Sequence, residues 1–160
     1  MWLVVLALTA ASPRPPITAE AILADLSRRH PISVVESLLQ DPAAWETVMR
    51  GIASGASEWF KVAHGLGRGV DAGSSEMLEE ALSEALVVAP DRTLREFGVE
   101  GTCERLGKDD TKPLSAAQVH ALVKKRLDAL RRVVAPDLQK ARGACERALR
   151  EQEAVRLEAR

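Results

Sequence analysis

The feature that most constrains the fold of this 160-residue chain is a helical spacing of apolar residues that Pro or Gly interrupts at short intervals. Segment 42–52 is typical, because its apolar residues recur every three or four positions and so share one face of a helix. They are Trp45, Val48, Met49 and Ile52. Asp41 can cap this helix, and Pro42 suits its first turn. A Pro cannot continue a helix from the preceding turn, so the pattern predicts a series of short amphipathic helices.

Composition supports the same fold class. The chain contains no Tyr, and aromatic residues make up only 3% of it. Leu, Ala, Glu and Arg are abundant, and they favour helices, whereas strands favour aromatic and β-branched residues. We therefore predict an all-α fold, an irregular bundle or array of about six to eight short and medium helices with two long helices at the C-terminal end. The length fits one domain, which we place at residues 18–160.

The helix boundaries follow from caps, prolines and glycines. Helices are predicted over residues 18–29, 31–41, 42–52, 74–89, 91–97 and 115–134, and from 137 to the C-terminal region. A helix of one or two turns begins at Ser57 and directs Trp59, with Val62, Ala63 and Leu66, toward the interior. A loop over 65–73 follows, and Ser74 or Ser75 caps the next helix. Segment 99–113 has turn residues and no sustained period.

The two cysteines are expected to pair. Cys103 lies in the irregular segment, and Cys145 shares the apolar face of the last helix with Leu138, Ala141 and Leu149. In an oxidising compartment such a pair forms a structural disulfide, worth roughly 3–4 kcal/mol on the chain-entropy model. The alternative is a pair of buried free thiols.

The N-terminal residues predict export from the cytosol. Residues 1–11 form an uncharged apolar run that is too short to cross a bilayer and ends in small residues, so we interpret it as a signal peptide followed by a Pro-rich linker at 12–17. The alternative is a buried N-terminal helix. Export of a bacterial protein with this pattern predicts a periplasmic or secreted location, without stable membrane insertion after processing.

Charge is unevenly distributed. Residues 1–111 carry 10 basic and 17 acidic side chains, a net charge of −7, whereas residues 112–160 carry 12 and 6, a net charge of +6. The helices after residue 115 predict an exposed basic surface, made of Lys124, Lys125, Arg131, Arg132, Arg142, Arg147 and Arg150. No aromatic residues are interleaved with them, so nucleic-acid binding is not expected. This surface either balances the acidic half or attracts an acidic partner.

Arg126 stands out because a helical wheel places it at the centre of an apolar face, among Val119, Leu122 and Leu130. A buried guanidinium needs a carboxylate or carbonyl partner, and the acidic first half of the chain offers candidates. Two interpretations stay open, a buried ion pair or a site for an anion or partner.

No other motif predicts chemistry strongly. His30, His64 and His120 are too scattered for metal-ligand spacing, so no metal or cofactor is expected. The glycines at 65–73 lack the strand and spacing of a phosphate-binding loop. A thiol nucleophile at Cys103 or Cys145, assisted by His64 or His120, would require a reduced cysteine.

Four features together resemble a group of small exported helical proteins of proteobacteria that have no assigned activity. They are segments 45–52, 57–60 and 70–76 and the two cysteines, and the resemblance covers residues 40–150. It implies an exported location and a helical fold, and it supplies no catalytic residues.

These observations predict a non-enzymatic role in the bacterial cell envelope, either structural or in binding another envelope protein. The alternative is a cell-envelope hydrolase with a carboxylate or thiol site. Convergent carboxylates in an open pocket would favour the hydrolase, and an exposed apolar patch would favour binding.

Overall fold

The computed structural model describes residues 16–106 and 114–158. All secondary-structure elements in these ranges are helices, and none is a strand. The predicted signal peptide at 1–11 lies outside the described residues, as does most of the predicted linker. The all-α prediction is confirmed.

The helices are short or medium in length. They are α1 (Ala19–Arg28), α2 (Pro31–Leu39), α3 (Pro42–Ala53), α4 (Ser57–Leu66), α5 (Ala72–Val88), α6 (Pro90–Phe97), α7 (Glu100–Cys103), α8 (Ala116–Leu130), the 3₁₀ helix η1 (Pro136–Leu138) and α9 (Gln139–Glu158). As predicted, two long helices of 15 and 20 residues, α8 and α9, lie at the C-terminal end.

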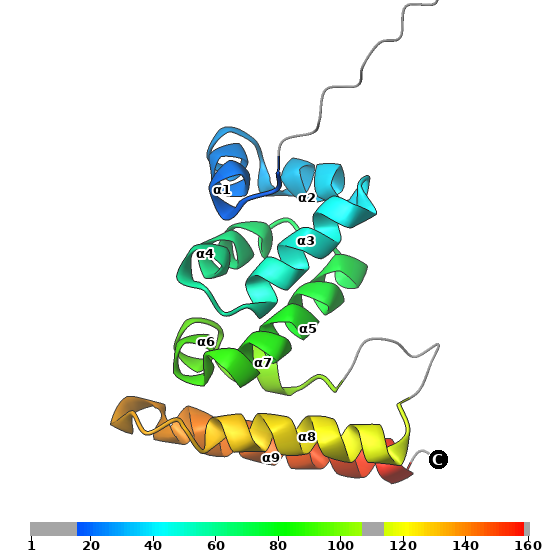
Figure 1. Ribbon diagram of the computed structural model, residues 1–160, viewed down its shortest axis with the longest axis vertical. Coiled ribbons are helices and arrows are strands. Elements are labelled where there is room, and N and C mark those ends of the chain that lie inside the picture. The colour runs from blue at the N-terminus through cyan, green and yellow to red at the C-terminus, as the bar shows by residue number, and fades with distance from the viewer. Residues whose placement is uncertain (1–15, 107–113, 159–160) are drawn as a thin grey trace, which may run out of the picture.

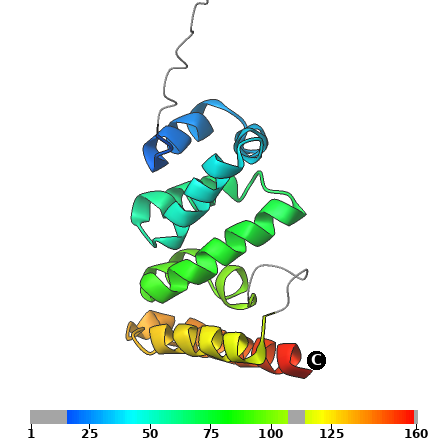
Figure 2. The same ribbon diagram turned by 45° about the vertical axis from the view of Figure 1, so that its right-hand side comes forward.

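The helices stack in successive layers along the longest axis of the molecule, which is the array form of the prediction (Figure 1). The layers are α1 with α2, α3 with α4, α5 with α6 and α7, and the paired helices α8 and α9 (Figure 2). Each layer packs on the next: α3 contacts α2 and α5, and α5 contacts α8.

Buried apolar side chains form two clusters. The first extends from α1 to α5 and includes the fully buried Phe60 and Ile52. The second begins at Leu86 near the end of α5 and includes buried residues of α8 and α9. Helix α5 contributes to both clusters and so joins the two halves of the array.

Two local predictions were wrong, and one was confirmed in part. As predicted, Val62, Ala63 and Leu66 of α4 are buried, and Trp59 is partly buried against the first cluster. The fully buried aromatic of α4 is Phe60. The indole of Trp59 lies against Gly51 of α3, where an added Cβ would come within 2.3 Å of the ring. Gly51 thus provides a flat surface on α3 that the helical wheel could not show.

The two wrong predictions concern the start of α5 and the end of α8. Helix α5 begins two residues earlier than predicted, because Asp71 caps it and Ser74 completes a reciprocal capping box. Helix α8 ends at Leu130 rather than near residue 134, and Val134 is 77% exposed.

Candidate functional site

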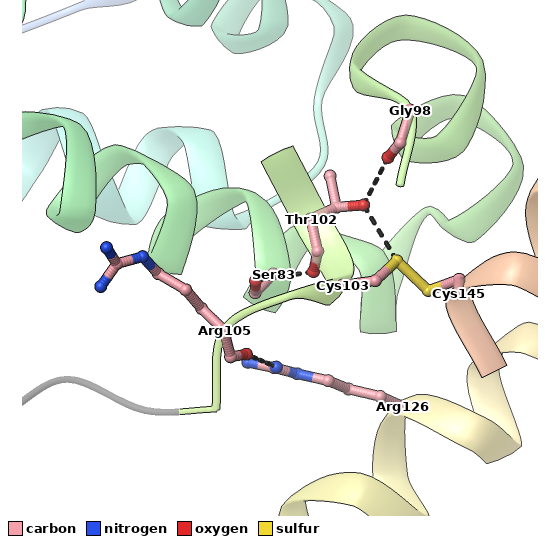
Figure 3. The surroundings of a disulfide bond; sticks show 7 residues. All are labelled: Ser83, Gly98, Thr102, Cys103, Arg105, Arg126 and Cys145. Carbon is pink, nitrogen blue, oxygen red and sulfur yellow. Dashed lines mark hydrogen bonds between the residues drawn. A yellow bond between two sulfur atoms is a disulfide. The ribbon is translucent and has the colours of Figure 1, made fainter. Parts of the chain in front are cut away.

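The disulfide between Cys103 and Cys145 joins α7 to α9, and the Cα atoms of the two residues are 5.3 Å apart (Figure 3). Both cysteines are fully buried in the second apolar cluster. The predicted pairing is confirmed. A thiol nucleophile at either cysteine is therefore ruled out in this oxidised protein.

Buried hydrogen bonds hold the short helix α7 in place. The Ser83 hydroxyl of α5 donates to the carbonyl of Thr102, with an oxygen–oxygen distance of 2.7 Å. The Thr102 hydroxyl donates to the carbonyl of Gly98 at 2.6 Å (Figure 3). Helix α7 is thus tied to α5, to the end of α6 and, through the disulfide, to α9.

Arg126 projects from α8 toward the residues after α7 and is only 2% exposed. One terminal guanidinium nitrogen donates to the carbonyl of Arg105 (Figure 3). Its Nε atom has no hydrogen-bond partner in the part of the chain that the structure describes. Burial lowers the pKa of Arg126 to about 10, and attraction to Glu80 and Glu84 opposes this shift. A backbone carbonyl and the attraction to two carboxylates thus compensate the buried charge only in part.

A pocket with a volume of about 450 Å³ lies mainly between α3 and α5; we call it the α3–α5 pocket. Its apolar lining comes from Leu39, Pro42, Trp45, Met49, Met77 and Ala81. The Trp45 indole N–H donates to the sulfur of Met77 at 3.2 Å, which links the two helices across the pocket. Leu39 is 38% exposed at its edge, so the apolar lining reaches the protein surface.

The charged lining of the α3–α5 pocket is mainly acidic. Glu46 of α3 and Glu80 and Glu84 of α5 contribute carboxylates, and Arg50 contributes a guanidinium. A nitrogen of Arg50 lies 3.7 Å from a carboxylate oxygen of Glu46. The three carboxylates and the one guanidinium give the lining a formal charge of −2. The pocket therefore combines an apolar lining with an excess of negative charge.

A smaller pocket of about 300 Å³ adjoins the first, since Glu84 lines both. It lies where the ends of α3 and α5 meet α8, and its apolar lining includes Leu122 and Val88, of which Val88 is 62% exposed. Lys125 and Arg126 also line it, so its charge differs from that of the α3–α5 pocket.

The predicted basic residues do not form one uniform surface. Lys124 and Arg131 both contact Asp128, at 2.8 Å each. Arg132 donates to the carbonyl of Val87. Three further members of the set, Lys125, Arg147 and Arg150, are exposed.

Arg142 pairs with Glu146 at 2.9 Å within α9. Three of the seven predicted basic residues thus lie against a neighbouring carboxylate. Whether this surface binds a partner stays a prediction.

The histidines lie in separate contacts. His64 is 3.3 Å from Glu96 and stacks on the Phe97 ring, and His120 is 2.6 Å from Glu153. In the described residues, no group of three His, Cys, Asp or Glu side chains could hold a metal ion.

Within residues 16–106 and 114–158, none of the helices has both the length and the apolar character needed to cross a bilayer.

The sequence did not single out the α3–α5 pocket. Trp45 and Met49 belong to the predicted apolar stripe of α3, but a stripe does not show how completely the neighbouring helices cover it. Glu80 and Glu84 are spaced at i and i+4, which places them on one side of α5, yet this spacing is also common on solvated surfaces.

Comparisons with protein-family models, with curated proteins and with solved structures found no match to this chain. The resemblance to small exported proteobacterial proteins therefore stays a prediction. Any function must be inferred from the residues of the chain and their geometry.

Proposed function

We propose that this protein is a non-enzymatic binding protein of the bacterial cell envelope, which holds another protein at the α3–α5 pocket. The observation that carries the proposal is the apolar lining of this pocket, which reaches the surface at Leu39. Leu39 and Pro42 are exposed at the pocket. Exposed apolar side chains beside a pocket are typical of a binding site, because covering them with a partner is favourable.

The proposed location rests on the disulfide and the N-terminal sequence. A disulfide that joins two helices persists in an oxidising compartment, such as the periplasm or the extracellular space. The apolar run at residues 1–11 has the length of a signal peptide core. Both observations support export of a bacterial protein.

The hydrolase alternative retains one observation in its favour: carboxylates from two helices, Glu46 and Glu84, line the same pocket. Against it, the lining between them is apolar, and Trp45 is 3% exposed, which leaves little ring surface for stacking on a sugar. We therefore favour binding over hydrolysis.

Site-specific photocrosslinking in the periplasm tests the proposal. A photoreactive amino acid at Leu39, at the edge of the pocket, is expected to give a crosslinked adduct of discrete mass with another envelope protein. The same amino acid at Val155 of α9, which is 60% exposed and not among the pocket-lining residues, serves as the control. Equal adducts at both positions, or none at Leu39, would contradict the proposal.

A further inference from the structure

We infer that the occupant of the α3–α5 pocket is a basic amphipathic helix of the partner protein. This inference rests on the proposed function and specifies the chemistry of the partner. Three observations carry it: the apolar lining, the excess of carboxylates around it, and the contribution of carboxylates from both α3 and α5.

The lining suits the apolar side chains of a helix. A volume of about 450 Å³ falls within the range of roughly 300–1,000 Å³ that is usual for binding pockets. Met49 and Met77 contribute to the lining from opposite helices. Methionine is unbranched and polarisable, so such a surface adapts to anchors of different shapes. Apolar residues at i, i+3 and i+7 of a bound helix would provide these anchors.

The surrounding charge specifies the polar side of that helix. Among the described residues, three carboxylates and one guanidinium line the pocket, so a basic occupant is attracted and an acidic one is repelled. Glu46 of α3 and Glu84 of α5 contribute carboxylates from the two helices that form the pocket. Lysines or arginines on both sides of the apolar stripe of a bound helix would match this arrangement.

A second copy of this chain fits the pocket less well. Its C-terminal helices carry the basic excess, of which Lys124, Arg131 and Arg142 are paired with carboxylates. Among the described residues, the exposed Lys125, Arg147 and Arg150 lack a stripe of exposed apolar residues beside them. Within the described part of α9, Val155 is the one large apolar side chain that is exposed. We therefore assign the pocket to a different protein. The test described below would also detect binding to a second copy of this chain.

The test uses the oxidised full chain and two fluorescent model peptides. Both peptides have leucines at helical spacing; one has lysines at the remaining positions and the other has glutamates. Fluorescence anisotropy at about 150 mM salt gives the two dissociation constants, under conditions that screen weak long-range attraction. We expect the lysine peptide to bind at least about tenfold more tightly than the glutamate peptide, because both present the same apolar face.

Two variants locate the binding site. Glu46→Gln with Glu84→Gln removes two carboxylates of the pocket and is expected to weaken lysine-peptide binding about tenfold. The matched control is Glu58→Gln with Glu151→Gln, two exposed positions that are not among the pocket-lining residues, with an expected change below about twofold. Leu39→Lys, at an exposed site, is expected to weaken binding as well, and circular dichroism checks that each variant is folded.

The outcomes separate the inference from the proposed function. Equal binding of both peptides, or equal losses in the pocket and control variants, would overturn the inference. A dimer in sedimentation that Leu39→Lys abolishes would overturn it in favour of a second copy. If the lysine peptide fails to bind while the crosslinker at Leu39 still captures an envelope protein, the inference is wrong and the proposed function stands. If both fail, both are wrong.

Discussion

The positively charged side chain of Arg126 is buried where α8 meets the residues that follow α7. It lines the smaller pocket together with Leu122 and Val88, and its guanidinium donates to the carbonyl of Arg105. A buried cation of this kind loses hydration, and its interactions with a carbonyl and distant carboxylates recover only part of that loss. The lowered pKa of Arg126, about 10, reflects the same balance.

Two substitutions separate packing from charge at this residue. We expect Arg126→Ala to lower the free energy of unfolding by about 3 kcal/mol, because it leaves a cavity and an unpaired carbonyl. Arg126→Met is expected to cost only about 1 kcal/mol, since methionine fills the space without a buried charge. Urea unfolding measures both values. Equal losses would mean that the hydrogen bond of the guanidinium, rather than its packing, stabilises the fold.

At the scale of elements, α5 is the helix on which most of the structure depends. It contributes to both apolar clusters, to both adjoining pockets and, through Ser83, to the position of α7. Its start is defined by Asp71, whose carboxylate accepts from the Ser74 backbone N–H at 2.9 Å and from the Ser74 hydroxyl at 2.6 Å.

The cap of α5 predicts a specific dependence on pH. Hydrogen bonds from the Ser74 hydroxyl and backbone N–H lower the pKa of Asp71 below its ordinary value of 3.8. Its ionised form therefore stabilises the folded state above that value, and this contribution is lost as the pH falls through the lowered pKa. We expect Asp71→Asn, which keeps a capping oxygen without the charge, to lower the urea midpoint at pH 7. The difference from the natural chain should shrink as the pH is lowered below 3.8 through the lowered pKa of Asp71. A difference that keeps the same size as the pH is lowered would show that charge is not its cause.

The elements were largely predictable because their boundaries depend on local chemistry. Pro31, Pro42 and Pro90 each occupy a first helical turn, and Ser115 caps α8 with Gln118 as predicted. The α3–α5 pocket was not predictable, because it depends on how closely two helices about 30 residues apart in sequence approach each other. Trp59 illustrates the same limit, since its position depends on a glycine of another helix.

At the scale of the whole molecule, the covalent connection between helices lies in the second cluster. The disulfide closes a segment of 42 residues between α7 and α9. The first cluster, which lines part of the α3–α5 pocket, includes neither cysteine. Noncovalent packing holds the helices around the proposed binding site.

Removal of the disulfide is therefore expected to affect the two halves differently. Cys103→Ala with Cys145→Ala should lower the free energy of unfolding by about 4 kcal/mol, the chain-entropy value for a segment of this length. In hydrogen exchange, amide protection of α9 should fall more than that of α3. An equal loss in both helices would indicate that the two clusters unfold as one unit.

The layered packing also has a consequence for how the chain can fold. Each layer contacts mainly its neighbours, so the contacts of α1 to α4 with α5 do not depend on α8 or α9. The disulfide, in contrast, requires α7 and α9 to lie side by side, because Cys103 and Cys145 belong to these two helices. Oxidation of the two cysteines therefore fixes the last helix onto layers whose own packing does not need it.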